Sequence, residues 1–154
     1  MVYAVIRVRG TVNVNPDIKK TMQLLKLTRV NHCVLLEENV VYKGMLQMVK
    51  DYTTWGEVNK ETLTKLICAR GRIIGDKPLT VEYLTTATPY HSFEKLSESI
   101  LENKVKYKEI PEVKPYFRLN PPKKGYRTIK RSFVNKGTLG YRKSEINKLI
   151  ERML

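Results

Sequence analysis

The sequence has few of the residues that build catalytic and metal sites. Its 154 residues include only two cysteines, two histidines and one tryptophan. A metal site needs several ligands at suitable spacing, and among these Cys and His residues only His32 and Cys33 lie close together. Adjacent strand residues point to opposite faces, so this pair converges poorly on a metal or as base and nucleophile. The residues therefore predict no enzyme activity, no metal site and no cofactor.

Long apolar runs are also absent. No stretch approaches the roughly 18 apolar residues of a membrane-spanning helix. The alternating, arginine-containing start at residues 1–10 is not typical of a signal peptide. Cys33 lies in an apolar run and Cys68 in a helical pattern, so we expect two buried, reduced thiols that are not joined. These features favour a cytoplasmic protein without a membrane partner.

Acidic residues are scarce relative to basic ones. The chain has 29 Lys and Arg against 15 Asp and Glu, which gives a net charge of +14. Residues 104–143 hold 13 basic and 2 acidic side chains, a net charge of +11. So strong a field favours a polyanionic partner, and no basic amphipathic helix with a broad apolar face points to a membrane surface. A soluble protein that merely happens to be basic is the alternative.

The basic segment 104–143 is also rich in residues that interrupt regular structure, namely Pro111, Pro115, Pro121, Pro122, Gly125, Gly137 and Gly140. Prolines break helices and are excluded from central strands, so we expect an irregular or hairpin-like arm outside the main core. Its cations alternate with aromatic residues, which suits phosphates and unstacked bases, whereas a solvated basic tail is the alternative. The arm residues expected to bind RNA are Arg118, Lys123, Lys124, Arg127, Lys130 and Arg131, with Tyr126 as a stacking candidate.

The first 58 residues predict a β-α-β-α-β unit of the α+β class. Residues 2–9 alternate, with Ala4 and Ile6 on one face and Tyr3 and Arg7 on the other, which predicts a half-buried strand. Helices are expected over 16–27 and 39–52, capped by asparagines at their starts, and strands over 33–36 and 53–58. The prediction is a small three-stranded sheet with helices on one face, whose other face something else must cover.

The remainder predicts a helical and irregular C-terminal extension. Apolar spacing indicates helices over 60–70, near 80–84, over 92–102, and from Ser144 to the end. We therefore divide the chain into an RNA-binding core at 1–58, a helical extension at 59–103, and a basic Pro/Gly-rich arm at 104–154 that ends in a helix.

Two motifs of the core resemble a known family. They are Asn31-His32-Cys33-Val34-Leu35-Leu36 and Tyr42-Lys43-Gly44-Met45-Leu46. Their order resembles the large-subunit ribosomal protein thirty family, whose eukaryotic relative is large-subunit ribosomal protein seven. The core resemblance covers residues 2–58, while segments 118–122 and 137–140 are similar to the extension of archaeal and eukaryotic members. The sequence starts at the first strand, without the basic N-terminal arm of the eukaryotic form, and so resembles an archaeal member.

The resemblance implies a structural component of the large ribosomal subunit that binds and stabilises ribosomal RNA. It implies a place near the small RNA of the same subunit and beside neighbouring ribosomal proteins, with no catalytic residue and no cofactor. By position, Arg29, Asn31 and His32 match an RNA-facing loop, and Lys43 and Gly44 match a helix start that approaches RNA. Alternatively, Gly44 only permits close helix-sheet packing. The alternative function is an RNA-binding regulator or RNA chaperone outside the ribosome.

Overall fold

The computed structural model describes residues 1–154 and is built on a five-stranded sheet. Its central strand β1 (Val2–Arg7) runs antiparallel to both β2 (His32–Glu37) and β3 (Thr53–Glu57). Two-residue strands extend the sheet at each side, β4 (Phe117–Arg118) beside β2 and β5 (Gly140–Tyr141) beside β3, in the order β4-β2-β1-β3-β5. The predicted α+β class is thus confirmed, and the sheet has two strands more than predicted.

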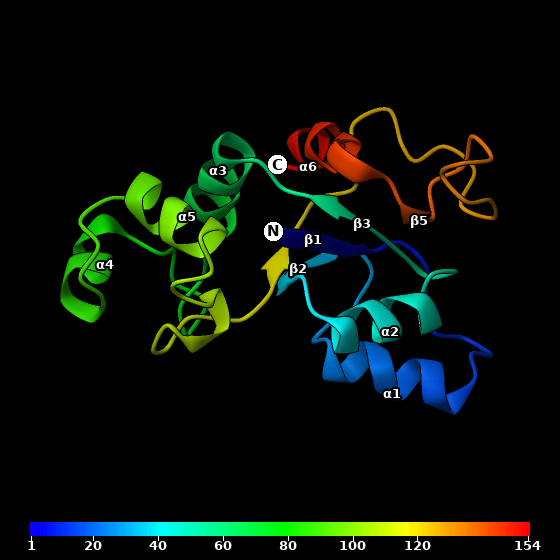
Figure 1. Cartoon of the computed structure of the whole chain (residues 1–154), viewed down its shortest axis with the longest axis horizontal. Coiled ribbons are helices and arrows are strands. Elements are labelled where there is room, and N and C mark those ends of the chain that lie inside the picture. The colour runs from blue at the N-terminus through cyan, green and yellow to red at the C-terminus, as the bar shows by residue number, and fades with distance from the viewer.

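Two helices cover one face of this sheet, as predicted. They are α1 (Pro16–Leu24) and α2 (Val40–Met48), which lie side by side in Figure 1. The side chains of Asn15 and Asn39 each accept a backbone N–H from the second residue of the helix, at 2.9 and 3.3 Å. These hydrogen bonds confirm both predicted caps. Such caps can be predicted from sequence because the capping residue and the helix start are neighbours in the chain. Both helices end earlier than predicted, and after α1 the chain turns at Lys26, whose φ is 61°.

The C-terminal extension covers the opposite face. Its helices are α3 (Lys60–Arg70), α4 (Val81–Ala87), α5 (Phe93–Leu101) and α6 (Ile146–Met153). Helices α3 and α6 pack on the sheet, α5 packs on α3, and α4 lies farthest from the sheet in Figure 1. The last helix does not start at Ser144 as predicted; Ser144 lies in a 3-10 turn, Lys143–Glu145, that precedes α6. No helix combines the length and apolar composition needed to cross a bilayer.

Strand β1 is buried on both faces, not on one. Ala4 and Ile6 face α3 and α6, whereas Tyr3 and Val5 join the cluster under α1 and α2. Arg7 is also buried, and its guanidinium donates to the carbonyl oxygens of residues 27 and 28 at 2.9 and 2.6 Å. The expectation of a half-buried strand was wrong because the extension covers the face that the core alone leaves open.

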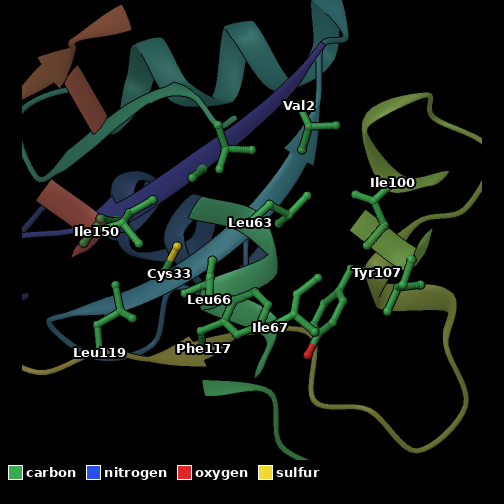
Figure 2. Close-up of a cluster of buried hydrophobic side chains, with 14 of the residues drawn as sticks. Val2, Cys33, Leu63, Leu66, Ile67, Ile100, Tyr107, Phe117, Leu119 and Ile150 are labelled. Carbon is green, nitrogen blue, oxygen red and sulfur yellow. The ribbon is translucent and has the colours of Figure 1, made fainter. Parts of the chain in front are cut away.

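The first part of the basic segment lies inside the core rather than outside it. Buried apolar side chains of this part are Tyr107, Ile110, Val113, Phe117 and Leu119. Figure 2 shows Phe117 close to Leu66 of α3, with Leu119 on the side of Cys33. The expectation of a wholly external arm was wrong because it rested on the charge and proline content of the segment, and these apolar residues are irregularly spaced among its charges and prolines. The division of the chain at residues 58 and 103 stays a prediction.

Glycine 56 lets α6 approach the sheet. Gly56 lies in β3, and a Cβ atom there would collide with the carbonyl oxygen of Lys143 and lie 3.0 Å from Cβ of Ile146. Only a residue without a side chain fits under the start of this helix. The contact ties the C-terminal extension to the sheet.

The two cysteines are free and separate, as predicted. Cys33 is fully buried in β2, and burial raises the pKa of its thiol to about 12, so it stays protonated at neutral pH. Cys68 is exposed on α3. The expectation that both thiols are buried was wrong because the apolar stripe of α3 faces the core through Leu63, Leu66 and Ile67, and Cys68 lies beside that stripe.

Candidate nucleic-acid interface

The loop before β2 is held in shape by the basic segment. Asn31 has a φ of 64°, and its N–H donates to the Arg7 carbonyl at 2.8 Å. The N–H of Leu119 donates to the Asn31 carbonyl at 3.1 Å, and the Tyr126 hydroxyl donates to Oδ1 of Asn31 at 2.7 Å. Arg29 is exposed at the tip of this loop. The structure therefore joins the loop and the arm, which lie far apart in the sequence.

His32 supports this loop from inside. Its ring is buried, stacks on Tyr116 with centroids 4.7 Å apart, and has Nδ1 3.2 Å from the Thr28 hydroxyl. Burial, and then the nearby charges of Arg118 and Arg29, lower the pKa of His32 to about 4. The imidazole is therefore neutral at physiological pH, and it shapes the surface rather than supplying a cation.

Lys43 and Gly44 lie at the other end of β2, away from Arg29. Lys43 is exposed and pairs with Glu38 at 2.7 Å, while its N–H donates within α2 to the Asn39 carbonyl. That N–H is not free for a phosphate, contrary to our expectation for a helix start. Gly44 is exposed, with nothing within 4 Å of an added Cβ, so the alternative of tight helix-sheet packing is also wrong. Gly44 instead leaves an open surface on α2.

The six predicted arm cations are all exposed but lie at three places. Arg118 lies in β4 beside β2, where it pairs with Asp76 at 3.3 Å. Lys123 and Lys124 lie beside the end of α6, where Arg152 donates to the Lys123 carbonyl at 2.6 Å. The remaining three, Arg127, Lys130 and Arg131, belong to the loop that precedes β5, and Arg127 lines one pocket together with Arg152. Five of the six form no ion pair, Arg118 being the exception.

Tyr126 has less free ring surface than a stacking platform needs. Its ring is half-buried against the hydrophobic cluster between the sheet and helices α3 and α6. Burial raises the pKa of its hydroxyl to about 12. With its hydroxyl bound to Asn31, the side chain positions the arm against the loop.

Arg142 is a buried residue of the arm that the sequence analysis missed. Its guanidinium donates to the Thr138 carbonyl and, at 2.8 Å, to the Thr54 hydroxyl, and it lies 4.9 Å from the centre of the Phe133 ring. Burial lowers the pKa of Arg142 to about 10, so it remains a cation at neutral pH. It fixes the loop that carries Arg127, Lys130 and Arg131 to the edge of the sheet. No sequence pattern indicates this role, because Arg142 is one of 13 basic residues in the segment 104–143.

Comparison with known proteins shows the family of this chain. Residues 3–53 match the family described as Ribosomal protein L30p/L7e. The chain is 45% identical to large ribosomal subunit protein uL30 of Methanocorpusculum labreanum, over 98% of this chain and 99% of that protein. It is 47% identical to uL30 of Methanosphaera stadtmanae over 99% of both chains, and 48% identical to uL30 of Thermoplasma volcanium over 98% and 92%. The chain therefore belongs to the L30p/L7e family of ribosomal proteins.

Proposed function

We propose that the loop before β2 and the basic arm together bind ribosomal RNA. The loop is called the Asn31 loop below and comprises residues 25–31. As a family member, the chain is a structural, RNA-binding component of the large ribosomal subunit, and it works in the ribosome in the cytoplasm. The family is not enzymatic. Its partners are ribosomal RNA and neighbouring ribosomal proteins.

The observation that carries the proposal is the junction between loop and arm. Asn31 accepts from both Leu119 and Tyr126, so exposed Arg29 and Arg118, the neighbour of Leu119, lie on one preformed surface beside His32. Cations without carboxylate partners are available to phosphate, whose contacts supply most of the salt-dependent affinity. A preformed surface also avoids part of the ordering cost of a disordered tail.

We further propose that the protein contacts more than one RNA segment, including the small RNA of the same subunit. The support is the distribution of the arm cations, since Arg118 lies in β4 beside β2, whereas Lys123 and Lys124 lie beside the end of α6. Nucleotide protection on assembled large subunits tests this. Protection confined to one short segment of the large RNA would contradict it.

A charge-neutralised variant tests the role of the arm. Changed to Gln are Arg118, Lys123, Lys124, Arg127, Lys130 and Arg131. If each cation neutralises one phosphate, they supply a log-log salt slope of about −4 to −5, and the variant should lose most of it. Its melting temperature should change little, because exposed charges contribute little to stability. The matched control carries six Gln substitutions at exposed cations of the other parts of the chain: Lys19, Lys20, Lys26, Lys50, Lys77 and Lys95.

The arm variant and the control variant should give opposite results if the core, rather than the basic arm, binds RNA. An unchanged slope in the arm variant, with a reduced slope in the control, would place the binding surface on the core. The alternative function, a regulator or RNA chaperone outside the ribosome, is tested by sedimentation. Co-sedimentation with large subunits in high salt supports a ribosomal component, and its absence supports the alternative.

A further inference from the structure

Three arginines line one open pocket of about 270 Å³. Arg70 is the last residue of α3, Arg72 lies two residues further along the chain, and Arg118 belongs to β4. The fourth lining residue is Asp76, and no apolar side chain lines the pocket. Backbone pairing fixes the walls, because the Lys114 N–H donates to the Arg72 carbonyl at 2.9 Å. Residues distant in the sequence are thus brought into one polar concavity.

The positive charge of this pocket is only partly compensated. Asp76 pairs with Lys114 and with Arg118, whereas neither Arg70 nor Arg72 pairs with a side-chain carboxylate. One Nη of Arg70 donates to the Leu154 oxygen, but its buried Nε–H has no acceptor. The one hydrogen bond of the Arg72 side chain, to the Gly71 carbonyl, is long at 3.4 Å. Two guanidinium groups therefore keep N–H donors without protein acceptors.

The arginines that stabilise the fold look different. Arg7 and Arg142 are buried, and their guanidinium groups donate to protein acceptors at 2.9 Å or less. Arg72 has no such partner, so folding does not account for its position. A planar guanidinium presents paired donors that match the oxygens of a phosphate, which makes arginine clusters suited to that group.

We propose that Arg70, Arg72 and Arg118 form a clamp for one phosphodiester group of RNA. Asp76 orients Arg118 from the side of the pocket. The clamp adjoins the proposed RNA-binding surface at the Asn31 loop. Arg118 pairs in register with His32, and His32 follows Asn31 in the chain. This inference rests on the proposed function. It extends the RNA-binding surface to the end of α3, which lies in residues 1–103, outside the segment whose net charge indicated a polyanionic partner.

Binding of a large-subunit RNA transcript across a salt series tests the clamp. The variants are R72Q and R70Q/R72Q, and the matched control is K19Q/K20Q, which removes two exposed cations of α1. The double variant should bind at least tenfold more weakly at fixed salt, and its log-log slope should be shallower by about 1. The control should keep the wild-type slope. R72Q alone is included because it should not disturb folding, since the only protein hydrogen bond that it removes is the long one to Gly71.

A charge-preserving variant separates clamp geometry from charge. R70K/R72K keeps both cations but lacks the paired donors, so we expect the wild-type slope with weaker affinity. Inorganic phosphate, added against chloride at equal ionic strength, identifies the source of the anion. It should weaken RNA binding of the wild type more than that of R70Q/R72Q.

The outcomes separate this inference from the proposed function. If wild-type protein does not bind the transcript, both fall. If wild type binds and R70Q/R72Q matches the control in affinity and slope, the clamp is wrong and the function stands. If inorganic phosphate shifts the Nε–Hε NMR signals of Arg70 and Arg72 but RNA affinity is unchanged in the variants, the pocket is a free-phosphate site and the clamp is also wrong.

Discussion

Buried and exposed basic side chains serve different purposes in this protein. Arg7 and Arg142 direct their donors at backbone carbonyls and hold loops against the sheet. Arg29 and the exposed arm cations lie on the surface those buried residues shape. A buried arginine without hydrogen-bond acceptors would be costly, so these carbonyl contacts are needed for the loops to keep their shape.

Burial of His32 predicts a loss of stability in weak acid. Its pKa in the folded state is about 4, against an ordinary 6.5, so the unfolded chain binds the proton more readily. The stability it contributes is present above pH 6.5 and is lost as pH falls towards 4. Between pH 7 and 5 the free energy of unfolding should fall by about 1–2 kcal/mol from this group.

Denaturant unfolding of wild type and two histidine variants at both pH values checks this. H32N should show a smaller loss between pH 7 and 5 than wild type, whereas H91Q, at an exposed position, should lose as much as wild type. An equal loss in wild type and H32N would show that His32 does not cause the pH dependence.

The hydroxyl of Tyr126 couples the arm to the Asn31 loop. Y126F removes the 2.7 Å bond to Asn31 and should cost about 1 kcal/mol of stability. It should also weaken RNA binding, because the two parts of the surface lose their connection. Thermal unfolding and transcript binding measure both effects. Y90F, at a half-buried tyrosine whose hydroxyl makes no hydrogen bond, is the control, and an equal effect of both changes would contradict the coupling.

At the scale of elements, two glycines of the core predict opposite effects of alanine. G44A, on the open face of α2, should raise stability by about 0.5–1 kcal/mol because alanine favours a helix. If RNA approaches this face, as the family resemblance implies for Lys43 and Gly44, G44A should also weaken transcript binding. G56A should lower stability strongly, because its Cβ meets the start of α6.

Urea unfolding and the same RNA-binding assay distinguish these cases. A G44A variant that is more stable and binds RNA as tightly as wild type would remove Gly44 from the interface. A G56A variant as stable as wild type would show that α6 does not rest on β3.

Elements with local signals were predictable, and those fixed by distant contacts were not. Asn15 and Asn39 each cap a helix as the sequence predicted, since a cap and its helix are neighbours in the chain. Strands β4 and β5 have two residues each, and only pairing with β2 and β3 defines them. The exposure of Arg29 could be predicted. The neutral state of His32 depends on its burial and on the charge of Arg118, which lies far away in the sequence, so no local pattern reveals it.

At the scale of the whole molecule, both faces of the sheet are covered, and one of them is covered only by the C-terminal extension. We therefore predict that residues 1–58 do not fold alone. In that fragment Val2, Ala4 and Ile6 would lose the cover of α3 and α6. Their exposure forfeits about 25 cal/mol for each Å² of apolar surface left in water. We expect little amide protection in the isolated fragment and strong protection of β1 in the full chain. Cooperative unfolding of the fragment would contradict this and support an autonomous core.

The two short outer strands have a consequence for the protein before it meets RNA. Strand β4 lies beside β2 and β5 beside β3, so neither long outer strand of the core is wholly open to another chain. Unprotected sheet edges recruit further strands and lead to aggregates, and edge strands of only two residues are poor templates for such growth. The same segment that carries most of the positive charge thus shields a newly made protein from self-association during its passage to the assembling subunit.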